Sequence, residues 1–168
     1  MKTLLRPLIG AAAVGLALSL VVHLTAVARV PSPFGGAAWI LHAGIFVVWF
    51  PAVLASRALT RDARRGDFWR VALRGCPPWM RYMAYGFFGY AVISFVMFVL
   101  GFFGQRDDEF PSLRGFSGHW MAFYAAGLAL LSSYVRADTA VRRCVNGHAA
   151  SVMANYCEMC GQPVERRA

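Results

Sequence analysis

Four long stretches without a charged residue alternate with shorter polar or basic segments along the chain. Each stretch is close to the roughly 20 residues that a helix needs to cross about 30 Å of hydrocarbon. None shows the period-two alternation that a strand of a membrane-spanning barrel requires. The pattern therefore predicts four transmembrane helices, at Leu8–Ala28, Ala37–Ser56, Tyr82–Gly104 and Ser117–Val135.

Composition supports a membrane protein over a soluble one. The chain has 168 residues, of which 58% are apolar and 15% charged. Globular chains are about 45–50% apolar, and a soluble protein this short lacks the interior volume to bury the excess. We therefore expect an all-α membrane protein whose residues 1–136 form a four-helix bundle.

The distribution of Lys and Arg predicts the orientation of this bundle. The N-terminus, the segment 57–81 and the tail after Val135 together hold 14 of these residues, whereas the two loops on the other side hold three. Because cytoplasmic loops carry the excess of positive charge, we expect a multi-pass inner-membrane protein with both termini in the cytoplasm. The excess of Arg over Lys suggests a GC-rich bacterial genome.

An alternative reading applies to the first apolar stretch. Lys2 and Arg6, an apolar run and the sequence Ala26-Val27-Ala28 resemble a cleavable secretory signal. The run is longer than the usual core of 7–15 residues, which favours a retained helix. Cleavage would leave the other three helices oriented as before.

The segment 57–81 is the most basic part of the chain. Its middle, Phe68–Arg74, mixes aromatic and aliphatic residues with Arg and predicts a short interfacial helix. Nucleic acid is the less favoured partner, because the topology rule alone accounts for an Arg-rich cytoplasmic loop. We expect contacts with anionic lipids from Arg57, Arg61, Arg64, Arg65, Arg70 and Arg74.

The tail, residues 137–168, contains a pattern of metal ligands. Cys144 and His148 precede Cys157 and Cys160 in the arrangement C-x3-H-x8-C-x2-C, and four such ligands on two tight turns suit tetrahedral zinc. The tail has too few apolar residues for a core, so metal binding would supply its folding energy. A cytoplasmic position disfavours disulfides. We therefore predict a small zinc ribbon with one structural Zn²⁺.

Two resemblances accompany these patterns. The segment Cys144–Pro163, with C-x-N-G-H followed by Y-C-x-x-C-G, resembles the zinc-ribbon modules of bacterial and archaeal proteins. This resemblance implies an interaction module more often than an enzyme. The stretches Arg74–Tyr90 and Gly115–Tyr124 resemble an uncharacterised family of small bacterial four-helix membrane proteins, which implies an architecture and no activity.

Three histidines fall within the predicted spans, all near the outer boundary. By helical rise, His23, His42 and His119 lie roughly 8, 8 and 3 Å inside it, and ionisable groups at such depths are candidates for function. A cluster of the three would suit a metal ion, a quinone or, less well, a haem, because two axial ligands alone do not define a haem pocket. The plainer reading is that each histidine bonds to a neighbouring helix.

Together these patterns favour a non-catalytic membrane protein that presents a cytoplasmic zinc ribbon to a protein partner, in assembly or regulation. A closed set of four ligands leaves no open position for reactive water. Two alternatives stay open: a redox or transport subunit that uses the outer histidines, and a sensor in which oxidation of the thiolates releases zinc.

Overall fold

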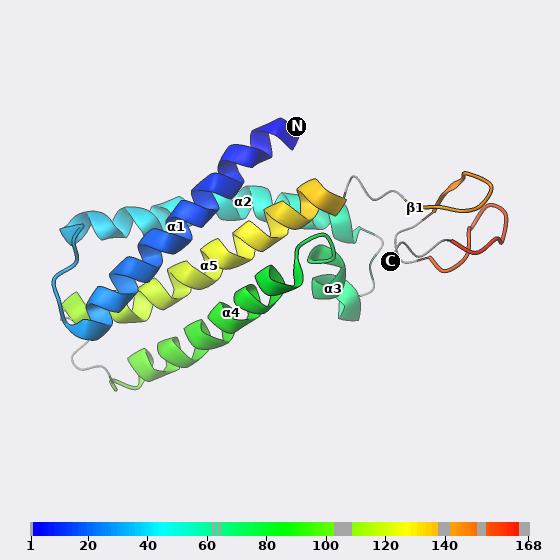
Figure 1. Ribbon diagram of the computed structural model, residues 1–168. Helices are drawn as coiled ribbons and strands as arrows, with labels where there is room; N and C mark the ends of the chain where they lie inside the picture. Colours follow the sequence, from blue (N-terminus) through cyan, green and yellow to red (C-terminus); the bar gives the residue numbers. More distant parts are fainter. Residues whose placement is uncertain are drawn as a thin grey trace.

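The computed structural model describes residues 2–61, 63, 65–102, 109–137, 142–150 and 154–164. Four long helices run side by side and two short strands lie in the tail (Figure 1). The long helices are α1 (Lys2–Ala28), α2 (Ile40–Thr60), α4 (Pro78–Val99) and α5 (Glu109–Ala137). The shorter elements are the 3-10 turns η1 (Gly35–Trp39) and η2 (Arg65–Asp67), helix α3 (Phe68–Ala72), and strands β1 (Arg142–Arg143) and β2 (Ala149–Ala150).

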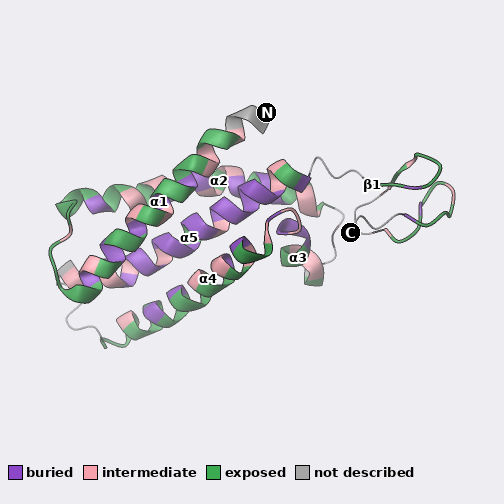
Figure 2. Ribbon diagram, viewed as in Figure 1, coloured by how far each residue is buried: buried purple, intermediate pink, exposed green. Residues whose placement is uncertain are grey.

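Helix α5 forms the centre of the bundle, and α1, α2 and α4 each pack against it. Its buried side chains include Trp120, Leu130 and Leu131, and burial is concentrated on this helix (Figure 2). The outer helices keep large apolar side chains exposed, such as Ile40 and Phe88. This distribution is what a bundle in lipid requires, because the apolar surface faces hydrocarbon and the polar groups are turned inward.

Within the described residues, three spans are long and apolar enough to cross a membrane: Leu5–Ala28, Gly35–Thr60 and Pro78–Val99. Helix α5 is not among them, although it is the longest helix. It carries buried Ser117, Ser132 and Ser133, which lower its hydropathy and which the other helices shield. The chain is therefore a helical protein with three spans of membrane-crossing character, and the fourth crossing, by α5, stays a prediction.

The helices differ from the predicted boundaries because a charge does not end a helix. α2 continues past Arg57 to Thr60, and α5 begins before Arg114. α4 begins at Pro78, where proline fits the first helical position. It ends in a Schellman motif, in which Phe102 N donates to Met97 O at 3.0 Å and Gly101 adopts a φ of 77°.

The first residues of α1, the connection between α2 and α4, and the last turn of α5 lie at the same end of the bundle (Figure 1). The predicted basic segments thus meet at one end. Helix α3 occupies the middle of the segment 57–81, where the sequence predicted a short helix. The tail follows α5 at this end, so the bundle determines where its ligands are held.

Candidate metal centre

Two tight turns build the ligand group in the tail. In the first, Gly147 N donates to Cys144 O at 2.8 Å and Cys144 N donates to His148 O at 3.0 Å. In the second, Gly161 N donates to Cys157 O at 2.8 Å and Cys157 N donates to Gln162 O at 2.7 Å. Gly147 and Gly161 have φ values of 78° and 70°, which residues with a Cβ rarely adopt. The glycines therefore let each turn close around its two ligands.

Short strand pairings hold the two turns together. β1 pairs with β2 antiparallel, with Arg143 opposite Ala149, on either side of the first turn. An isolated bridge joins Cys144 to Val164, and Val164 N donates to Asn155 O at 3.0 Å. The end of the described tail thus connects the first turn to the second.

The predicted ligands come together as one group. The ligand atoms of Cys144, His148, Cys157 and Cys160 all lie within 4.8 Å of one another. Cys144 Sγ lies 3.6 Å from Cys160 Sγ, and Cys157 Sγ lies 3.9 Å from His148 Nδ1. With metal–sulfur bonds of about 2.3 Å, a tetrahedral zinc site places its ligand atoms roughly 3.8 Å apart. The donor set and its spacing therefore fit a metal ion.

Burial in this group supports a closed site. Cys144 and Cys157 are buried, while His148 and Cys160 are partly buried. All four cysteines of the chain are free thiols. Of the residues that the structure describes, this is the one set of three or more Cys, His, Asp or Glu residues with ligand atoms this close.

The membrane histidines each have separate partners. His23 Nδ1 lies 2.8 Å from Ser117 Oγ, its Nε2 lies 2.5 Å from the Tyr90 hydroxyl, and Ser117 Oγ donates to Arg114 O at 3.4 Å. These contacts form a consistent chain in which Tyr90 donates to Nε2 and Nδ1–H donates to Ser117. Both ring nitrogens are thus engaged, and His23 links α1 to α4 and α5.

His42 and His119 point toward other neighbours. Trp120 Nε1 donates to His42 Nδ1 at 3.0 Å, whereas His119 Nδ1 donates to Gly115 O at 3.0 Å and its ring stacks edge-on against Phe95. The three histidines do not form a common ligand set within the described residues. His23 and His42 bond to neighbouring helices, as in the plainer reading, whereas His119 bonds within α5 and reaches α4 only through its ring contact with Phe95.

The arginines predicted to contact anionic lipid lie in different environments. Arg57 and Arg61 are exposed at the end of α2, and Arg70 pairs with Asp67 at 2.8 Å. Burial lowers the pKa of Arg74, which is partly covered. Arg64 lies outside the described residues, and of Arg65 only the backbone, in η2, is described.

The sequence did not predict which residues contact the histidines, and it did not single out Arg81. Tyr90 and Ser117 lack any local signature, because they meet His23 only through the packing of three helices. Arg81 donates from Nη2 to Leu73 O at 3.2 Å, across the break between α3 and α4. Its position in the first turn of an apolar helix was the only available signal.

Comparisons with protein-family models, curated proteins and solved structures found no match to this chain. The resemblance to a family of small bacterial membrane proteins therefore stays a prediction.

Proposed function

We propose that this chain is a non-catalytic, multi-pass protein of the bacterial inner membrane that holds a zinc-stapled tail at the cytoplasmic surface, where the tail binds a protein partner. The observation that carries the proposal is the four-residue group of Cys144, His148, Cys157 and Cys160, with ligand atoms within 4.8 Å of one another. Three sulfurs and one imidazole suit zinc, and four protein ligands complete its tetrahedron. Such a site stabilises a fold instead of activating water.

Exposed apolar side chains beside the ligands support partner binding. Val145, Tyr156 and Met159 are 69%, 67% and 77% exposed. Each is a sequence neighbour of a cysteine ligand, so the metal would fix all three in place. Large apolar side chains held rigid on a small, otherwise polar module are typical of an interaction surface.

The bundle supplies the location. Its apolar outer surface suits lipid, and the basic segments gather at the end from which the tail emerges. Zinc in the tail and insertion of the helices would together place the exposed trio within reach of a membrane-bound or cytoplasmic partner.

The test uses the full-length protein in native membranes, with a photo-crosslinking residue at Met159. The proposal predicts a discrete crosslinked product that disappears after metal chelation and in Cys157→Ser. The matched control is a crosslinker at Tyr82, which is 72% exposed but lies on α4. Absence of any metal-dependent product at Met159 would contradict partner binding by the tail.

A thiol sensor is the second candidate, favoured by the 3.6 Å separation of the Cys144 and Cys160 sulfurs. A peroxide would take two electrons from these thiolates, form a disulfide and release the metal. Mild peroxide should then release zinc from the wild type with the loss of two free thiols, and equally from Cys76→Ser, because Cys76 is not in the ligand group. Retention of zinc by the wild type under oxidant would exclude a sensor.

The third alternative, a redox or transport subunit built on His23, His42 and His119, has less support. His23 already uses both ring nitrogens within the bundle, and the other two histidines have partners of their own. A Soret band in the purified protein would instead support a redox subunit that binds haem.

A further inference from the structure

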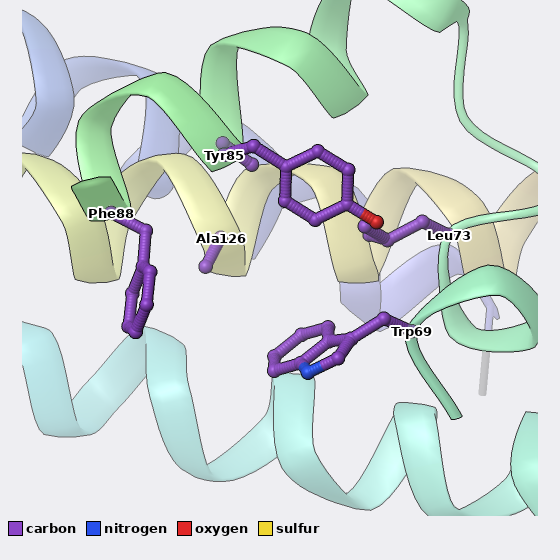
Figure 3. Close-up of a pocket in the computed structure, with 6 residues that line it drawn as sticks. Trp69, Leu73, Tyr85, Phe88 and Ala126 are labelled. Atoms are coloured by element: carbon purple, nitrogen blue, oxygen red, sulfur yellow. The ribbon is translucent and has the colours of Figure 1, made fainter. Parts of the chain in front are cut away.

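A lateral cavity of about 280 Å³ lies beside the central helix. Its lining is almost wholly apolar and comes from three elements: Trp69 of α3 with Leu73 just beyond it, Ala84, Tyr85 and Phe88 of α4, and Ala126 of α5. Figure 3 shows Phe88 and Trp69 on either side of Ala126, with the Tyr85 ring between α4 and Leu73. The cavity is thus a side-opening slot with the central helix as its floor.

The slot opens to the surroundings of the bundle. Trp69, Tyr85 and Phe88 are 49%, 45% and 64% exposed, so their rings form its rim and do not close it. Along a bundle in a bilayer, such a slot faces acyl chains. Small Ala84 and Ala126 leave the space between the rings unfilled by protein side chains.

Positive charge lies at one end of this slot. Arg81 precedes Tyr85 by one helical turn and donates to the carbonyl of Leu73, which lines the cavity. Its Nε is buried and has no hydrogen-bond partner among the described residues. Arg74 follows Leu73 and is partly covered, and the described residues show no ion pair for Arg74 or Arg81.

Along α4, the arginine and the apolar lining follow one another in the same order as the phosphate and the acyl chain of a phospholipid. Arg81 and Phe88 are separated by about 10 Å along α4 at 1.5 Å per residue. A phosphate at the level of Arg81 would therefore place the beginning of an acyl chain beside Tyr85 and Phe88. Guanidinium groups bind phosphate by charge-assisted hydrogen bonds, and the side chain of Arg81 is only partly buried.

We propose that this slot binds one anionic phospholipid of the adjacent leaflet, with an acyl chain between Trp69 and Phe88 and the phosphate at Arg81 and Arg74. The lipid would complete the surface of the bundle next to the segment from which the tail is displayed. The lipid site depends on membrane insertion and does not depend on metal in the tail. Its test can therefore fail while the test of the proposed function succeeds, and the reverse.

The test measures quenching of Trp69 by bromine atoms on lipid chains. The full-length protein is reconstituted in phosphatidylcholine bilayers that contain a fixed minority of brominated phosphatidylglycerol or brominated phosphatidylcholine. Because the chain has five tryptophans, the Trp69 signal is the difference between wild type and Trp69→Phe. We expect stronger quenching by the brominated anionic lipid, and a preference about fivefold weaker in Arg81→Gln, since one arginine near anionic lipid contributes about 1 kcal/mol.

Two further variants locate the lipid. Ala126→Leu fills the floor of the slot and should reduce quenching by both lipids, whereas Trp79→Phe, on the same helix as Arg81 but outside the lining, should leave the Trp69 difference unchanged. Detergent denaturation of the bundle reports whether each variant keeps its fold around the slot, and the wild-type comparison of the two lipids needs no variant.

Each contrary outcome overturns the proposal. Equal quenching by the two brominated lipids would rule out selection of an anionic headgroup. Absence of quenching at Trp69 would show that no acyl chain enters the slot. Protection of Trp69 from both lipids, together with a crosslinked dimer, would assign the slot to a second copy of the chain.

Discussion

The bundle and the tail bury different kinds of side chain. In the bundle, exposed side chains such as Ile40 and Phe88 are apolar, while His23 and Ser117 are buried and hydrogen-bonded. In the described part of the tail, the buried cluster consists of Cys144, Cys157 and Val164, and Met159 is exposed. The tail thus buries two of its candidate metal ligands where a soluble domain would bury a hydrophobic core.

The difference shows that the two regions are stabilised by separate means. Packing around α5 holds the bundle, whereas in the described part of the tail Val164 is the one buried residue beside the two buried cysteines, and we expect metal binding to supply the rest of its stability. A change at the ligands should therefore disorder the tail and spare the bundle, and a change in helix packing should do the reverse.

Metal removal should have the largest effect. Structural zinc binds small modules with apparent free energies of about 10–16 kcal/mol, so Cys157→Ser or chelation should abolish protection of the tail amides in hydrogen exchange. The amides of α1 and α5 should stay protected. Cys76→Ser is the control, because Cys76 lies in the bundle with its Sγ directed to Leu73 O at 3.0 Å. Equal loss of metal in Cys157→Ser and Cys76→Ser would contradict the claim that the tail and the bundle are stabilised separately.

Filling a close helix contact should come second. A Cβ at Gly15 would overlap the ring of Tyr124, which packs from α5 against α1. Gly15→Leu should therefore destabilise the bundle by about 1–3 kcal/mol, measured by detergent denaturation, while zinc content is unchanged. Gly10→Leu, where a Cβ meets nothing within 4 Å, is the matched control. An equal loss of stability in Gly10→Leu would point to a general effect of leucine in α1.

Loss of the buried histidine should come third. His23→Ala leaves Tyr90 and Ser117 without their shared partner, and hydrogen bonds within membrane bundles contribute roughly 0.6–1.7 kcal/mol each. We expect a loss of about 1–2 kcal/mol, with Tyr90→Phe reproducing part of it. In a double-mutant cycle the two effects should be non-additive. Additive effects would show that the His23–Tyr90 contact contributes nothing.

Breaking the exposed ion pair should have the smallest effect. The side chains of Arg70 and Asp67 are 64% and 36% exposed, and solvent-exposed pairs contribute about 0–1 kcal/mol. Arg70→Ala should change bundle stability by less than about 0.5 kcal/mol in the same denaturation assay. A larger loss would show that α3 is a structural part of the bundle.

The sequence was sufficient for local features. The four ligands lie within 17 residues, and Asn146-Gly147 and Gly161 mark the turns, so their assembly follows from spacing alone. The long apolar runs also located the four long helices. Helix ends were less predictable, since α2 continues past Arg57 and α5 begins eight residues before the predicted Ser117.

Rotation about the helix axes was beyond sequence reasoning. Helical rise put the three histidines at similar depth, but each residue also turns by about 100° about the axis. Ser117, His119 and Trp120 consequently face different neighbours, His23, Phe95 and His42. The sequence could not predict the lateral slot either. Residues from α3, α4 and α5 line it only after the helices have packed together.

X-ray absorption at the zinc edge tests the central claim most directly. The full-length protein, purified and reconstituted in bilayers, should contain one zinc per chain, with three sulfurs at about 2.3 Å and one nitrogen at about 2.0–2.1 Å. The assigned ligands are Cys144, Cys157, Cys160 and His148. Absence of zinc, or a coordinated water oxygen in place of one of these ligands, would contradict a closed structural site.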